Sequence, residues 1–162
     1  MNLVYISDTN ILIDFRHAGM LEVLFQLPFT LCCTDFVLFE LNDFDHDELT
    51  EMGLSVVELD EDSVESLSEL TDAHNNSSLA DVSCYFLAKS TGRPLLTGDG
   101  QLRKQAAKDG LQVHGALWLL DRLVEVNIVT KIQAAMGLQA MLAAGARLPR
   151  QECALRIANW QI

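Results

Sequence analysis

The chain has 162 residues, of which 49% are hydrophobic and 21% are charged, a composition typical of folded globular domains. This composition excludes disordered, collagen-like and coiled-coil proteins, and no apolar run reaches the roughly 20 residues of a membrane span. The net charge of −12 is unevenly spread: residues 1–88 hold eighteen acidic residues and one basic residue, whereas residues 89–162 hold five acidic and ten basic residues. An acidic half of this kind would repel a polyanion, which argues against a general nucleic-acid coat protein.

Short apolar runs alternate with helical segments along the chain, a pattern typical of an α/β domain with a mainly parallel sheet. The five predicted strands are residues 3–6, 30–33, 54–59, 94–97 and 111–114. The predicted helices are residues 10–17, 20–27, 34–49, 62–73, 79–89, 101–109 and 117–126, with two more within 130–145 and 150–159. A turn is predicted at residues 75–77. We expect a single domain over residues 1–162, with a core over about 1–118 and a helical extension over about 119–162.

The four cysteines show neither a CxxC pair nor a histidine at a zinc-type spacing. They are Cys32, Cys33, Cys84 and Cys153. We therefore expect them to be buried and reduced, as small hydrophobic side chains. Reduced cysteines, together with an N-terminus that has no basic region and no cleavage site, predict a cytoplasmic protein.

Two carboxylates follow predicted strands at tight turns. Asp8 comes directly after the first strand, and Asp99 stands between two glycines after the fourth. An aspartate in such a place is often only a helix N-cap. Parallel strands, however, bring their carboxyl ends to one edge of the sheet, where ligands bind in open α/β folds. We therefore expect Asp8 and Asp99 to lie close together.

Two further acidic residues lie in predicted helices. Asp81 stands three residues after Ser78, the spacing of a capping box with Asp in place of Glu, so that a capping role and a functional role are both open. Glu40 lies in an apolar helical stretch and faces either solvent or a positive charge.

A site that gathers carboxylates needs a cation, because two unit charges about 4 Å apart repel by roughly 4 kcal/mol at an effective dielectric constant near 20. Oxygen ligands favour Mg²⁺ or Mn²⁺, whereas zinc favours His or Cys. Such an ion binds phosphate oxygens and promotes hydrolysis of the phosphate ester. The acidic residues therefore predict cleavage of a phosphodiester or a phosphomonoester.

Four segments, taken in order, resemble the motifs of PIN-domain nucleases. Asp8 to Asp14 resembles the opening Asp-x-Asn motif after the first strand, and Phe39 to Leu41 resembles the second acidic position. Leu79 to Ser83 resembles the third position, and Leu95 to Asp99 resembles the fourth, with its Thr-x-Asp. The similarity covers residues 1 to about 118, and the tail resembles a VapC-like branch with extra C-terminal helices.

The resemblance implies a PIN-like α/β/α sandwich with a central, mainly parallel five-stranded sheet. It also implies an endoribonuclease that uses Mg²⁺ or Mn²⁺. The catalytic and metal-binding residues would be Asp8, Glu40, Asp81 and Asp99, with Glu40 binding directly or through water.

Other implications concern neighbouring residues and partners. Asn10 and Thr97 would orient the first and last acids through hydrogen bonds. Many small PIN proteins are toxins of toxin–antitoxin pairs, so an RNA substrate, an antitoxin protein and a homodimer are expected. No membrane partner is expected.

The sequence departs from the PIN pattern in one respect. Many PIN domains carry a further acid shortly after the fourth, but residues 100–104 contain none, and the next acid is Asp109. We therefore expect weak binding of a second metal. Asp14 is open between a contribution to that metal and a solvated or capping role, of which we favour the second. The basic residues around Arg103 are open between phosphate binding and a solvated helix face.

Two alternatives remain. The first is a PIN-fold protein with weak or no catalysis that acts by binding protein or RNA. The second is a HAD-like phosphatase with Asp8 as nucleophile, but Asn10 stands where that chemistry requires an acid.

Overall fold

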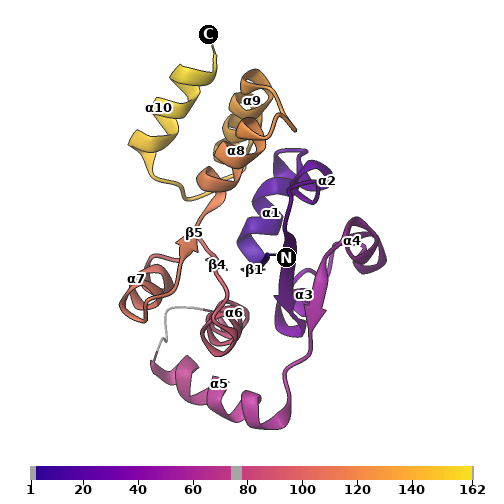
Figure 1. The fold of residues 1–162 in the computed structure, drawn as a ribbon, viewed down its shortest axis with the longest axis vertical. Helices are drawn as coiled ribbons and strands as arrows, with labels where there is room; N and C mark the ends of the chain where they lie inside the picture. Colours follow the sequence, from indigo (N-terminus) through magenta and orange to yellow (C-terminus); the bar gives the residue numbers. More distant parts are fainter. Residues whose placement is uncertain (1–2, 74–77, 162) are drawn as a thin grey trace.

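A single sheet of five strands forms the centre of the molecule (Figure 1). The computed structural model describes residues 3–73 and 78–161. The strands are β1 (Val4–Ser7), β2 (Thr30–Thr34), β3 (Ser55–Val57), β4 (Leu95–Leu96) and β5 (Val113–His114). Their order is β3-β2-β1-β4-β5, and all four pairings are parallel, which confirms the predicted fold class. The predicted turn at 75–77 lies outside the described residues.

Helices cover both faces of this sheet. They are α1 (Thr9–His17), α2 (Leu21–Leu24), α3 (Asp35–Glu40), α4 (His46–Met52), α5 (Glu61–Ala73), α6 (Leu79–Thr91), α7 (Gly100–Lys108), α8 (Ala116–Glu125), α9 (Lys131–Ala143) and α10 (Arg150–Trp160). One layer contains α1, α2, α8 and α9, and in the other layer α3, α5 and α7 each contact α6 (Figure 1). Because both faces are covered, the neighbouring side chains of Cys32 and Cys33 are both buried although they point to opposite faces.

The predicted helix over residues 34–49 is wrong, because the structure divides it into α3 and α4. Helix α3 ends at Glu40, and Asp45 begins α4 as an N-cap that accepts a hydrogen bond from the Glu48 amide at 3.2 Å. The segment between them is held by Arg16, which pairs with Asp43 at 2.7 Å and lies over the Phe44 ring. The capping preference of aspartate here outweighs the helical periodicity.

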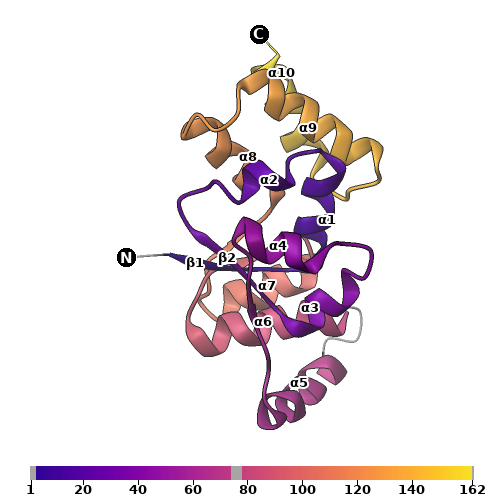
Figure 2. The same cartoon turned by 90° about the vertical axis from the view of Figure 1, so that its right-hand side faces the viewer.

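The C-terminal helices stack at one end of the molecule, and α5 lies at the other (Figure 2). Helix α10 packs on α9, and an ion pair between Arg156 and Asp121 at 2.8 Å joins it to α8. Helix α9 approaches the segment after α1 so closely that a Cβ at Gly137 would overlap the Met20 sulfur. Over the described ranges, no helix combines the length and the apolar character needed to cross a bilayer.

Candidate functional site

Strands β1 and β4 end side by side at the centre of the sheet. Ser7 pairs with Leu96, and the Asp8 amide donates to the Leu96 carbonyl at 3.0 Å. Strand β2 lies on one side of β1 in the sheet, and β4 lies on the other side. This is the point where the strand order reverses, and crevices for ligands form there in open parallel sheets.

Asp8 is fully buried at this point and is held by three hydrogen bonds. Its Oδ1 accepts from the Ile11 amide at 2.9 Å, which makes Asp8 the N-cap of α1. Its Oδ2 accepts from the Thr97 hydroxyl at 2.6 Å and from the Gly98 amide at 3.3 Å. Burial raises the pKa of Asp8, since loss of solvent outweighs these hydrogen bonds. The capping role and the position at the strand edge therefore coexist.

Thr97 connects the two carboxylates that follow the strands. Its hydroxyl donates to Asp8 and accepts from the Asp99 amide at 3.1 Å. Asp99 in turn caps α7, because its Oδ1 accepts from the amides of Gln101 and Leu102 at 2.9 and 3.1 Å. The backbone of the turn thus fixes the place of Asp99 next to Asp8.

Helix α6 carries Asp81 to the same edge. The Ser83 hydroxyl hydrogen-bonds the Thr34 hydroxyl at the end of β2 at 2.6 Å, and the Cys84 thiol donates to the Ser7 carbonyl at the end of β1 at 3.3 Å. These contacts hold the first turn of α6 over the strand ends. Asp81, which lies in that turn, is therefore positioned by contacts with β1 and β2.

The environment of Asp81 disfavours a negative charge. The residue is only 7% exposed, and its Oδ1 has no hydrogen-bond partner among the described residues. Burial raises the pKa of Asp81 to about 7, and the charge of Asp8 adds to this effect. A hydrogen bond with Ser78 lowers the pKa, whereas the charges of Glu40 and Asp99 raise it further. The carboxylate is thus close enough to three others to feel their charge.

Glu40 occupies a different position from the other three. It is the last residue of α3 and is exposed, and it does not line the cleft formed by the others. Its charge still contributes to the raised pKa of Asp81. The structure therefore brings Asp8, Asp81 and Asp99 together and leaves Glu40 outside this group.

Asp14 is a carboxylate of the cleft that the sequence analysis assigned to a solvated or capping role. It is half-buried on α1, and burial together with the charge of Asp8 raises its pKa to about 6, whereas His17 lowers it. Asn10, Asp14 and His17 all line the cleft. Their spacing of four and three residues places them on one face of a helix, and this signal was present in the sequence.

The predicted hydrogen bond by which Asn10 would orient Asp8 is not formed among the described residues. The Asn10 side chain is exposed. The backbone amides of Ile11 and Gly98 and the hydroxyl of Thr97 occupy the carboxylate oxygens instead.

The cleft over these residues has a volume of about 650 Å³. It lies between α1, the first turn of α7 and the loop of residues 144–148 that joins α9 to α10. Asp14, Asp81 and Asp99 line it together with Arg147, whereas Asp8 is buried beneath. We call it the acidic cleft.

The donor chemistry of the acidic cleft fits a hard divalent cation, because every candidate ligand is a carboxylate oxygen. The unpartnered Oδ1 of Asp81 also fits one, since a buried oxygen without a hydrogen bond is costly. However, within residues 3–73 and 78–161 no three acidic, histidine or cysteine side chains are arranged to hold a metal. Asp109, the next acid along the chain, is not in the lining, because it pairs with Tyr85 and Lys89 at the other end of α7.

Comparison with known proteins identifies the family. The family model described as DUF3368: PIN domain matches residues 4–161, so the chain belongs to the PIN-domain family. This membership confirms the resemblance in the sequence and places the chain outside the phosphatase family. The VapC-like branch stays a prediction.

Several solved structures are similar to this chain. One of them is a PilT N-terminus domain protein, SSO1118, from the hyperthermophilic archaeon Sulfolobus solfataricus P2, with 9% identity and a TM-score of 0.48. The match covers 74% of this chain and 92% of that protein, and a likeness of this size supports no conclusion on function. No curated protein matches the chain.

Proposed function

We propose that this PIN-domain protein is an endoribonuclease that hydrolyses RNA phosphodiesters with Mg²⁺ or Mn²⁺. The observation that carries the proposal is the meeting of Asp8, Asp81 and Asp99 at the reversal of strand order, with a buried oxygen of Asp81 left without a hydrogen bond. These carboxylates disfavour one another's charge, and a bound cation would remove that cost.

In this proposal the residues of the chain position the metal ligands before the cation binds. Asp8, Asp81 and Asp99 would hold the cation, with Glu40 acting from outside the cleft or through water. Thr97 keeps the carboxylate of Asp8 in place through a hydrogen bond of 2.6 Å. When bound, the cation supplies Lewis-acid stabilisation of the charge that develops on the phosphate.

The finer biological role is a further part of the proposal. We propose that the protein is a cytoplasmic toxin of the VapC type, homodimeric, and held inactive by an antitoxin. An arginine or lysine of such a partner would neutralise the acidic cleft, which supports this proposal because the cleft carries three carboxylates against Arg147.

A second candidate is a PIN-domain protein with weak or no catalysis that acts by binding. Two observations favour it: within the described part of the chain no metal-binding group of three side chains is already arranged, and Asp109 lies outside the cleft. This candidate predicts that RNA or protein binding continues after the acidic residues are replaced.

The experiment measures Mn²⁺ binding by calorimetry and cleavage of a structured RNA for the wild type and for a variant with both Asp8→Asn and Asp99→Asn. We expect the variant to lose both. The matched control is Asp62→Asn, which also removes one carboxylate but lies on the exposed face of α5. Mn²⁺ binding without cleavage in the wild type would favour the second candidate, and absence of Mn²⁺ binding would contradict the proposed mechanism.

A further inference from the structure

A second cleft lies next to the acidic cleft and shares part of its lining. It has a volume of about 900 Å³ and is bounded by α7, β5 and the first turns of α8 and α10. Six residues line both clefts: Gly98, Gly100, Ala116, Ala146, Arg147 and Leu148. Each cleft alone has the size of a site for one small ligand. A longer ligand that lies across the shared residues would contact both clefts.

Four of the five charged residues that line the second cleft, which we call the arginine cleft, are arginines. Arg103, Arg147 and Arg150 line it, all three are exposed, and none forms an ion pair with a described carboxylate. Arg156 also lines it, but its guanidinium is bound to both oxygens of Asp121 at 3.0 and 2.8 Å. Arg156 therefore fixes α10 on α8, and the other three arginines present positive charge to the cleft.

Two helix N-termini add to this positive potential. Helix α8 follows Gly115, helix α10 follows Pro149, and neither residue provides a side-chain cap. The first turns of both helices line the arginine cleft. Uncapped amide groups and the helix dipole favour an anion at such a position. Among the described residues that line the cleft, Glu152 is the one acid, so positive charges exceed negative charges there.

The wall between these arginines is aromatic. The rings of His114 and Trp118, which both line the cleft, stack with centroids 4.0 Å apart and an angle of 13°. Burial lowers the pKa of His114, and the charges of Arg103 and Arg122 lower it further, which favours the uncharged ring. Flat uncharged rings beside arginines are typical of surfaces that bind single-stranded nucleic acid.

We propose that the arginine cleft binds the backbone phosphates of a single-stranded RNA on one side of the position that the acidic cleft would cleave. This inference rests on the proposed function, because the acidic cleft would hold the scissile phosphate. The acidic half of the chain repels RNA, so the strand reaches the carboxylates along the arginines that the C-terminal half provides. The extension of α9 and α10 thereby acts in substrate binding, through Arg147 and Arg150.

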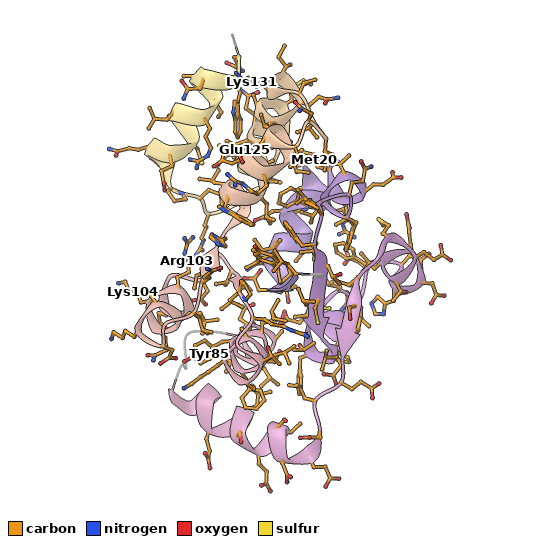
Figure 3. The ribbon with its side chains drawn as sticks, viewed as in Figure 1. Met20, Tyr85, Arg103, Lys104, Glu125 and Lys131 are labelled. Carbon is orange, nitrogen blue, oxygen red and sulfur yellow. The ribbon has the colours of Figure 1, made fainter. Side chains whose placement is uncertain are left out.

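The neighbouring residues Arg103 and Lys104 provide a matched pair for the test. Figure 3 shows that both leave α7, Arg103 toward β5 and the C-terminal helices and Lys104 toward the outside. The Arg103 guanidinium lies against Gly115, where a Cβ would come within 3.1 Å of it. Each residue carries one positive charge and both are exposed, so replacing either changes the net charge equally and leaves the core intact.

The experiment measures the fluorescence anisotropy of a labelled single-stranded RNA of twelve nucleotides, in EDTA, over a series of KCl concentrations starting at low salt. Arg103→Ala, Arg147→Ala and Arg150→Ala are each compared with the wild type and with Lys104→Ala. Each phosphate contact that is lost should reduce the slope of log K against log salt by about 0.7 and weaken binding roughly threefold or more. Lys104→Ala should change the affinity less than twofold.

Equal effects of Arg103→Ala and Lys104→Ala would overturn the proposal, because they would show an effect of net charge alone. Unchanged affinity in all three arginine variants would also overturn it, because RNA binding would then not involve the cleft. Because EDTA removes any metal, this result is independent of catalysis. A protein that fails to cleave RNA but shows the predicted slopes would refute the nuclease and retain the arginine cleft as an RNA site.

Discussion

The acidic cleft and the arginine cleft share six lining residues, yet their charged groups are held in opposite ways. Asp8, Asp81 and Asp99 are fixed by helix caps and strand ends, and Asp8 and Asp81 are buried with raised pKa values. Arg103, Arg147 and Arg150 are exposed, and no ion pair holds them within the described residues. The acidic cleft therefore costs stability in the absence of a cation, whereas the arginine cleft costs little. This difference supports the proposal that the acidic cleft binds a cation, while the N-caps at Asp8 and Asp99 also stabilise α1 and α7.

The largest effect that tests this contrast between the two clefts is expected in the pH dependence of the free energy of unfolding. Because Asp81 has a pKa of about 7 in the folded state against 3.8 in the reference state, its carboxyl is protonated in both states at low pH. As the pH rises from about 4 to about 7, only the unfolded state ionises freely, so the metal-free protein loses stability, by at most about 4 kcal/mol. Above pH 7 the penalty is constant.

Asp81→Asn should remove this loss. In EDTA at pH 8 the variant should unfold at a temperature several degrees higher than the wild type, because each kcal/mol corresponds to about 2–4 °C in a domain of this size. At pH 4 the two proteins should differ little. Thermal unfolding followed by circular dichroism at both pH values provides the measurement. A variant that is less stable than the wild type at pH 8 would show that Asp81 has a structural role.

A smaller effect is expected at Asp14, the other carboxyl of the cleft with a raised pKa. Its pKa of about 6 implies a loss of stability between about pH 4 and pH 6, in the same direction as for Asp81. Asp14 is more exposed than Asp81, so Asp14→Asn should stabilise the metal-free protein at pH 8 by less than Asp81→Asn does. The reverse order of the two unfolding temperatures would contradict the comparison.

The smallest effect is expected at Asn10. Removal of a side chain that orients a metal ligand typically reduces metal affinity by about 10–100-fold. Since Asn10 forms no hydrogen bond with Asp8 among the described residues, we expect Asn10→Ala to change Mn²⁺ affinity by less than about threefold. Calorimetry of wild type and variant in the same buffer makes the comparison. A loss of tenfold or more would restore the role that the sequence analysis gave to this residue.

The alternation of apolar runs and helical segments was sufficient to predict the fold, because strands buried on both faces read as continuous apolar segments. Each predicted strand corresponds to an observed one, including β4, of which the structure keeps only Leu95 and Leu96. The break between α3 and α4 was missed. It combines the N-cap at Asp45, a local signal that the helical periodicity obscured, with the ion pair between Arg16 and Asp43, a long-range contact that periodicity cannot reveal.

For the candidate site, the sequence predicted that Asp8 and Asp99 meet, because both follow parallel strands. It could not predict which carboxyl oxygens lack hydrogen-bond partners. The burial of the Asp81 Oδ1 without a partner depends on how Ser83 and Cys84 hold α6 against two strands. Asp14 was undervalued, although its spacing from Asn10 indicates a shared helix face. The arginine cleft was beyond prediction, because it joins Arg103 to Arg147 and Arg150 through the packing of the C-terminal helices.

The most direct test of the central claim is the anomalous scattering of Mn²⁺ in crystals of this protein grown with the metal. The account predicts an anomalous peak bounded by the carboxylates of Asp8, Asp81 and Asp99, with oxygen ligands at about 2.0–2.2 Å. The peak should be absent in Asp81→Asn crystals. A wild-type crystal without a peak in the acidic cleft, or with its peak elsewhere, would contradict the claim that these carboxylates are placed to hold a metal.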